Sequence, residues 1–144
     1  MDIQHLKSLL DACSTAKHVI ETLPELPKGM KPRHIHVLDQ IGMVCEGNGE
    51  CRVSDVSDGL NITMPSVTKL VQELESMHLV EKCSDQEDKR VTLLKLTSQG
   101  EAYVRKYVYD FQSKWTESLS FVPNEETEKA IRLIEQLAQA MPNK

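Results

Sequence analysis

Long apolar runs are absent from this 144-residue sequence, and that absence excludes one broad class of protein. No stretch approaches the roughly 20 apolar residues that a membrane-spanning helix needs. Residues 1–5 also lack the basic start of a secretory signal. We therefore expect a cytoplasmic protein with no membrane partner. At this length, a single domain with one core is the expectation.

Cysteine motifs and catalytic arrangements are missing as well. The four cysteines form no C-x-x-C pair, so zinc-ribbon spacing is absent. His34 and His36 stand two residues apart in an expected helix, where they point to different faces and cannot chelate a metal as a pair. No serine–histidine–carboxylate or paired-carboxylate arrangement can be argued from spacing. The sequence therefore predicts no catalytic residue, no metal and no cofactor.

Positive charge is scarce. The formal net charge is −5, and residues 51–100 carry six basic side chains against eight acidic ones. The six are Arg52, Lys69, Lys82, Lys89, Arg90 and Lys95. Because phosphate attraction supplies most non-specific affinity for nucleic acid, any such binding would depend on where these few cations lie.

The outer parts of the chain show the apolar periodicity that is typical of helices. We expect helices over residues 3–22, 32–45 and 98–120, with a proline-rich connector before the second and a loop at residues 46–50. A last helix is expected after Pro123, with Asn124 as its N-cap.

The centre of the chain reads as two short helices and a hairpin. A short strand is expected at residues 51–53, and Ser54 is the predicted N-cap of a helix over residues 55–60. Thr63 is the predicted N-cap of a helix that runs to about residue 77, with Pro65 in its first turn. Strands are expected at residues 80–84 and 90–96. Thr97 or Ser98 is the predicted N-cap of the helix that follows, and Ser98 would form a capping box with Glu101. The predicted fold class is mainly α with a small β-hairpin wing (α+β), a winged helix-turn-helix.

Six short motifs stand in this central part. They are Val53-Ser54-Asp55-Val56-Ser57, Leu60-Asn61-Ile62-Thr63, Pro65-Ser66-Val67-Thr68-Lys69, Leu74-Glu75, Asp85-x-x-Asp88-Lys89-Arg90 and Leu96-Thr97-x-x-Gly100. At these spacings the segment resembles the MarR family of winged-helix transcriptional regulators. The resemblance implies one MarR-like domain over residues 1–144, with a DNA-binding lobe at about 32–97 and dimerisation helices at about 1–30 and 98–144. The sequence departs from the family at His78, where glycine is common, although histidine tolerates a positive φ better than most residues.

The second helix of the pair is the predicted recognition helix. The exposed N-terminal half of such a helix enters the major groove, where hydroxyl, amide and amino groups meet base edges and phosphates. The predicted DNA-binding residues here are Thr63, Pro65, Ser66, Thr68, Lys69 and Gln72. The alternative is an ordinary solvated helix face.

The hairpin tip supplies a second predicted contact. In the family, the wing arginine enters the minor groove, whose negative potential attracts it, and Arg90 stands at that position. Asp88 is predicted to orient the guanidinium, and Lys89 to contact phosphate. The alternative is a surface ion pair of little value. In the family's architecture Arg33, at the start of the 32–45 helix, lies close enough to contact phosphate, and the alternative is a plain solvated helix start.

The apolar faces of the terminal helices have no evident partner within one chain, so we expect a homodimer. The alternative is that these helices fold back onto their own domain. The resemblance implies an unknown small-molecule effector that binds between the dimer helices and the lobe. Cys13 resembles the placement of the reactive cysteine in a peroxide-sensing branch, so a redox-sensing regulator is an alternative, as is ordinary packing of this thiol.

The leading hypothesis is a ligand-responsive repressor that binds pseudo-palindromic double-stranded DNA as a homodimer. The rival is a winged-helix protein-interaction module that has lost DNA binding, which the acidic balance motivates.

Overall fold

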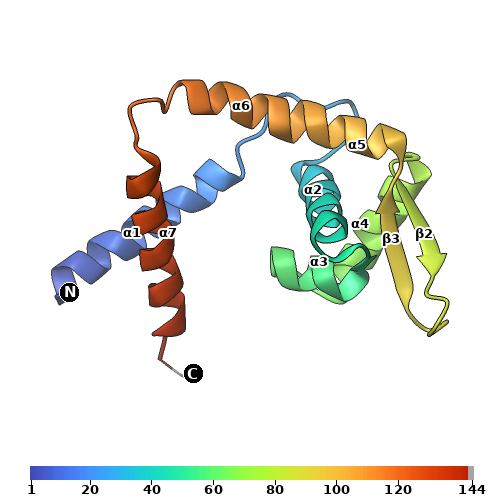
Figure 1. Cartoon of the computed structure of the whole chain (residues 1–144), viewed down its shortest axis with the longest axis horizontal. Helices are drawn as coiled ribbons and strands as arrows, with labels where there is room; N and C mark the ends of the chain where they lie inside the picture. Colours follow the sequence, from blue (N-terminus) through green and yellow to red (C-terminus); the bar gives the residue numbers. More distant parts are fainter. Residues whose placement is uncertain (143–144) are drawn as a thin grey trace. The chain divides into compact units, whose positions relative to one another are not determined.

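The computed structural model describes residues 1–142. The chain divides into two compact units, residues 1–111 and the segment that begins at residue 112. The elements are α1 (Ile3–Ile20), α2 (Pro32–Asn48), β1 (Cys51–Arg52), α3 (Val53–Leu60), α4 (Met64–Ser76), β2 (Val80–Ser84), β3 (Thr92–Leu96), α5 (Ser98–Val104), the π-helical turn η1 (Arg105–Tyr109), α6 (Asp110–Glu117) and α7 (Asn124–Gln139). Figure 1 labels the helices α1 to α7 and the strands β2 and β3. None of the helices formed by residues 1–142 has the length and apolar content that a bilayer crossing demands.

Helices α3 and α4 form the expected helix-turn-helix. Asn61 ends α3 in the left-handed conformation (φ 53°), which asparagine tolerates better than most residues. The Ser57 hydroxyl donates to the Ile62 carbonyl at 2.6 Å and secures the turn. Thr63 then caps α4 by accepting from the Ser66 amide, and Pro65 lies in the first turn, where its missing N–H costs nothing. Both predictions for the start of this helix are confirmed.

The wing is a three-stranded antiparallel sheet in the order β1-β3-β2. Strand β3 is central because β1 pairs with it on one side, with Cys51 opposite Leu94, and β2 pairs with it on the other. Between β2 and β3 the register runs from Val80 opposite Leu96 to Ser84 opposite Thr92. The predicted fold class, mainly helical with a small wing, is confirmed.

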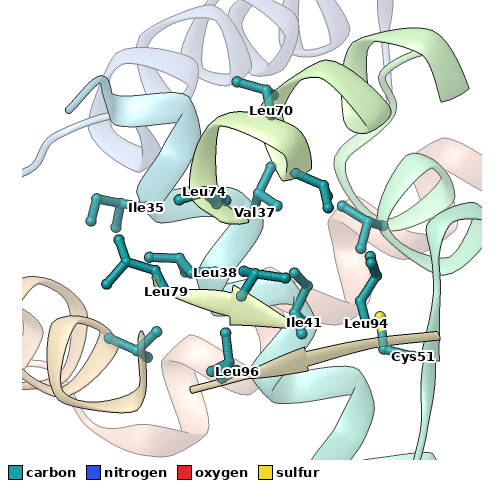
Figure 2. Close-up of a cluster of buried hydrophobic side chains, with 14 of the residues drawn as sticks. Ile35, Val37, Leu38, Ile41, Cys51, Leu70, Leu74, Leu79, Leu94 and Leu96 are labelled. Atoms are coloured by element: carbon teal, nitrogen blue, oxygen red, sulfur yellow. The ribbon is translucent and has the colours of Figure 1, made fainter. Parts of the chain in front are cut away.

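One apolar core joins α2, α4 and the wing (Figure 2). From α2 come Ile35, Leu38 and Ile41, each with no exposed surface. The recognition helix adds Val67, Leu70, Val71 and Leu74, and the wing region adds Leu79, Val80, Leu94 and Leu96. Both elements expected to face DNA therefore rest on the same face of α2.

Several element boundaries differ from the sequence predictions. The predicted loop at residues 46–50 is wrong in its first half, because α2 continues to Asn48 and ends at Gly49 in the left-handed conformation (φ 81°). The N-cap of α3 is Arg52, not Ser54, and the Asp55 carboxylate accepts from the Arg52 amide at 2.8 Å. Strand β3 starts at Thr92, so Arg90 lies in the turn at the tip and not on the strand.

The C-terminal helices also correct the prediction. Of the two predicted N-caps, Thr97 is confirmed, since it accepts from the Gly100 amide at 3.0 Å, and the expected capping box of Ser98 and Glu101 is wrong. The expected helix over residues 98–120 contains the π-helical turn η1 and ends at Glu117. Asn124 is the first residue of α7 and Pro123 is its N-cap. The spacing of apolar residues does not distinguish an α-helix from a π-helical turn, and it does not show at which residue a helix ends.

His78 adopts the left-handed conformation that its position requires (φ 63°). Beyond α4, the His78 amide donates to the Glu75 carbonyl at 3.0 Å and the Leu79 amide donates to the Leu74 carbonyl at 3.0 Å. These two bonds are those of a Schellman motif, which satisfies the last carbonyls of a helix and is usually completed by glycine. The departure at His78 therefore leaves the turn between α4 and β2 intact.

Replacing Gly100 with alanine is expected to destabilise the fold by about 2 kcal/mol, because a β-carbon there would overlap the Leu79 carbonyl oxygen. Gly47→Ala is the matched control, since its β-carbon would meet no atom within 4 Å on a helix where alanine is favoured. Urea unfolding of both variants measures the difference. A Gly100→Ala variant as stable as the wild type would contradict the close approach of α5 to Leu79.

Candidate nucleic-acid interface

The recognition helix α4 has one buried face and one open face. Its buried side consists of Val67, Leu70, Val71 and Leu74. On the other side Thr68, Lys69 and Gln72 are exposed. Among residues 1–142, the side chains of Lys69 and Gln72 form no hydrogen bond or ion pair, and Lys69 is a cationic neighbour of Glu73. Their amino and amide groups are therefore available for a ligand.

The hydroxyl groups at the start of α4 are partly engaged in the helix itself. Thr63 Oγ1 lies 2.8 Å from Ser66 Oγ and also accepts from the Ser66 amide. Thr68 Oγ1 donates to the Met64 carbonyl at 3.0 Å. Thr68 Oγ1 and Ser66 Oγ each keep a lone pair for accepting, but Ser66 is only half exposed. Thr63 and Ser66 thus shape the helix start first, and Pro65 beside them is exposed.

The wing tip holds a forked contact between Asp88 and Arg90. Arg90 Nε donates to Asp88 Oδ1 at 3.1 Å and Arg90 Nη2 donates to Asp88 Oδ2 at 3.2 Å. The Arg90 amide also donates to Asp88 Oδ1 at 3.1 Å. These bonds, led by the guanidinium, hold the pKa of the Asp88 carboxyl below its usual range. Arg90 is 91% exposed, so the pair adds little stability and serves to hold the guanidinium in place.

The rest of the tip keeps one acid away from the surface. Asp85 is only 14% exposed and lies 3.8 Å from Arg52 Nη2 on β1, while it accepts from the Glu87 amide at 3.0 Å. Lys89 and Glu87 are exposed. Arg52 was absent from the predicted site, and it supports the tip from the first strand. The tip therefore presents Lys89 and Arg90 with fewer outward carboxylates than the sequence suggests.

A small hollow of about 310 Å³ lies beside the recognition helix. Its lining comprises Ile20, Glu21, Arg33, His36, Leu60, Ile62 and Leu70. Arg33, predicted as a phosphate contact, is exposed at the start of α2 and belongs to this lining. A larger hollow of about 670 Å³ lies along the C-terminal half of α2, β3 and α5, with both carboxylates and cations in its walls.

Sequence reasoning missed a polar contact between α2 and α4, in which His34 is buried and the Glu73 side chain is 34% exposed. His34 is 1% exposed. Its Nε2 lies 2.5 Å from Glu73 Oε2, and its Nδ1 lies 2.9 Å from the Lys31 amide nitrogen. The hydrogen bond from His34 is the main reason that the pKa of the Glu73 carboxyl is lowered. A lone histidine in an otherwise apolar helix is more often part of a core than of a site, and no spacing rule links it to residue 73.

The thiols are all unpaired, and their settings differ. Burial raises the pKa of the Cys51 thiol to about 12, with Cys45 and Asp55 adding to the effect. Burial also raises the pKa of Cys45, whose Sγ donates to the Leu94 carbonyl at 3.5 Å. Cys13 on α1 is half-buried, and Cys83 on β2 is exposed. Cys45 and Cys51 are therefore protonated at neutral pH, which disfavours reaction with oxidants.

Some of the predicted site residues lie together in the structure, and others lie on separate elements. Thr63, Ser66 and Thr68 share the first turns of α4 with Lys69 and Gln72, and Asp88 contacts Arg90 directly. Arg33 and Cys13 lie on other helices. Over the described part of the chain, histidine, cysteine and acidic side chains form no group of three or more that could hold a metal ion.

Comparison with known proteins gives a consistent match. The family model described as MarR family matches residues 28–91. The HTH-type transcriptional repressor MdtR of Bacillus subtilis (strain 168) is 26% identical over 121 residues, which cover 83% of this chain and 76% of that protein.

Two solved structures show the same fold. The DNA complex of Streptococcus pneumoniae FabT matches with a TM-score of 0.68 and 23% identity, over 96% of each chain. The structure of Bordetella bronchiseptica BpsR, whose DNA binding is regulated by 6-hydroxynicotinic acid, matches with a TM-score of 0.65 and 21% identity, over 93% of this chain and 98% of that one. The matched segment carries the helix-turn-helix and the wing tip, so this part of the chain is similar to the MarR family, and the chain shares the fold of these two structures.

Proposed function

We propose that this protein is a ligand-responsive repressor that binds a pseudo-palindromic operator as a homodimer. The observation that carries the proposal is that one lobe presents two exposed surfaces suited to DNA contact. One is the free face of α4 with Lys69 and Gln72, and the other is Arg90, held by Asp88 at the wing tip. The repressor role is supported by the similar MdtR, itself a repressor.

The two surfaces suit two grooves. Lys69 and Gln72 lie in the middle of a helix whose first turns are capped and exposed, which is the geometry that enters a major groove. Arg90 is an exposed guanidinium on a narrow tip, which suits the negative potential of a narrow minor groove. Thr63, Pro65, Ser66, Thr68, Lys89 and Arg33 would add contacts to phosphates and base edges around them.

Because the lobe has more acids than bases, each contacting cation should matter. Lys69→Ala and Arg90→Ala are each expected to weaken operator binding about tenfold and to reduce the slope of log affinity against log salt by about one. Lys129→Ala on α7, which removes one charge from a surface pair with Glu125, is the matched control and should leave binding unchanged. Fluorescence anisotropy with DNA from upstream of the gene, across a salt series, measures all three. Unchanged affinity in both lobe variants would refute the site.

The dimer is inferred from apolar faces that the chain itself leaves open. Within the single chain no residue of α1 or α7 is buried. Exposed apolar side chains recur along both helices: Ile3, Leu10, Val19 and Ile20 on α1, and Ile131, Leu133 and Ile134 on α7, followed by Met141. Apolar surface of this extent is unusual on a soluble monomer and marks an association surface. A second copy of the chain is the partner that the family resemblance predicts.

Ile134→Glu is expected to shift the protein toward monomer, because it places a charge in the apolar face of α7. Gln136→Glu adds the same charge two residues away on the same helix and serves as the control. Sedimentation velocity at micromolar concentration reports the mass, and operator binding should fall with the dimer because a monomer reaches one half-site. A dimeric Ile134→Glu variant would show that α7 is outside the interface.

The hollow beside α4 is our proposed effector site. Arg33 and His36 provide polar groups, and Leu60, Ile62 and Leu70 provide an apolar wall. A volume of about 310 Å³ lies at the small end of ligand pockets, so a single aromatic ring with one carboxylate is the ligand class that fits. BpsR, whose effector is 6-hydroxynicotinic acid, supports this class. Since α2 and α4 both line the hollow, a ligand there can favour one arrangement of the recognition helix over another.

Benzoate and 6-hydroxynicotinate, each at millimolar concentration, are expected to weaken operator binding of the wild type. His36→Ala should reduce this response while it leaves DNA affinity without ligand unchanged, because His36 is not among the proposed DNA contacts. A titration of operator complexes with each compound measures the effect. An equal response in the His36→Ala variant would place the effector elsewhere.

Redox sensing receives less support than ligand sensing. The raised pKa values of Cys45 and Cys51 keep these thiols protonated, and Cys13 is half-buried. A sensing thiol needs exposure and a stabilised thiolate together.

A further inference from the structure

The contact between His34 and Glu73 connects α2 to the recognition helix α4. Among the described residues, His34 is the one buried side chain of a strongly polar or charged type. It lies in the first turn of α2, whereas Glu73 belongs to the recognition helix α4. The other buried residues that these two helices contribute to the described core are apolar (Figure 2).

The hydrogen-bond partners determine the state of the His34 ring. Nδ1 faces the Lys31 amide, which can only donate, so Nδ1 accepts and carries no proton. The ring proton is therefore on Nε2, which donates to Glu73 Oε2 at 2.5 Å. Each ring nitrogen thus has a partner, and the neutral ring with its proton on Nε2 links the start of α2 to the carboxylate on α4.

This bond constrains α4 in a way that the apolar contacts do not. Apolar side chains such as Leu38 and Leu74 hold the two helices together, but the attraction between them is not directional. A hydrogen bond to a buried ring is directional, so it defines the rotation of α4 about its own axis and its position along α2. Lys69 stands one helical turn before Glu73, and Gln72 immediately precedes it, so their directions depend on this rotation.

We propose that His34, acting through Glu73, is the positioning residue that sets the recognition helix for DNA. The inference rests on the proposed role of α4 as the DNA-reading helix. His34 is buried and would not touch DNA itself.

The negative charge of Glu73 allows a test, because its effect on DNA affinity is opposite in sign to that of a positioning role. Glu73 places a negative charge on the helix that approaches phosphates, with Lys31 and Lys69 as its cationic neighbours. By charge alone, removal of this carboxylate should strengthen DNA binding. If Glu73 positions α4, its removal should weaken binding instead. The two accounts predict opposite signs.

The experiment compares full-length Glu73→Met, Glu73→Gln and Glu75→Met with the wild type. Methionine has the length of glutamate but accepts no strong hydrogen bond, whereas glutamine keeps an oxygen that accepts from His34 Nε2 and removes only the charge. Glu75 lies on the same helix in an exposed ion pair with Lys82 at 3.6 Å, so Glu75→Met is matched for the loss of charge. Specific and non-specific DNA affinities are measured at a temperature where circular dichroism shows each variant folded.

Glu73→Met is expected to lower operator affinity about tenfold, a change of about 1.4 kcal/mol. Glu73→Gln should bind within about threefold of the wild type or more tightly, and Glu75→Met at least as tightly as the wild type, with a threefold change equal to less than one kcal/mol. The ratio of specific to non-specific affinity should fall in Glu73→Met alone, because loss of stability without misplacement of α4 would leave that ratio unchanged.

A spectroscopic measurement supplements binding. In the wild type, ¹⁵N-edited NMR should show a protonated Nε2 and an unprotonated Nδ1 for His34, with the Nε2 proton strongly deshielded; Glu73→Met should lose that deshielded signal. A ring protonated on Nδ1 in the wild type would overturn the proposal.

The binding outcomes separate the proposal from the function on which it rests. Equal affinities for Glu73→Met and Glu75→Met, whether raised or lowered, would overturn the role of His34. If Lys69→Ala weakens binding while Glu73→Met does not, only the positioning role fails. If neither variant changes binding, the assignment of α4 as the DNA-reading helix fails first.

Discussion

The packing of α4 and the wing on a single face of α2 is the constraint on which the rest of the structure depends. Ile35, Leu38 and Ile41 are fully buried in that face, and a buried aliphatic side chain of this kind contributes about 1.5–3 kcal/mol. The recognition helix and the wing therefore share one core and one support (Figure 2). A displacement of α2 would act on both elements that we propose approach DNA, which is what an effector beside α2 would require.

Local pairing explains how an acidic lobe can present positive charge. Arg52 turns Asp85 inward, and Asp88 is joined to Arg90 through both carboxylate oxygens. Two acids of the tip are therefore neutralised by arginines of the same chain. Asp85 pairs with Arg52 on β1, and Asp88 holds the Arg90 guanidinium in place. The net charge of the segment conceals this arrangement, because a sum over residues carries no directions.

The secondary structure was predictable wherever the signal is local. The cap at Thr63, the proline in the first turn of α4 and the periodic buried face of α4 all depend on neighbours within one or two turns. Predictions failed at the ends of elements, such as the extension of α2 to Asn48 and the π-helical turn inside the long helix. At those places tertiary packing competes with weak local preferences, and composition alone does not decide the outcome.

The sequence by itself determined the helix-turn-helix, the wing and the outward face of α4, because the periods of helix and strand need no knowledge of distant residues. It also placed Asp88 beside Arg90, two positions away. Only the tertiary structure decided that Asp85 meets Arg52 and that His34 meets Glu73, 39 residues along the chain. Such contacts depend on how whole elements pack and on the direction of each side chain across the interface, and neither is encoded in the spacing of residues.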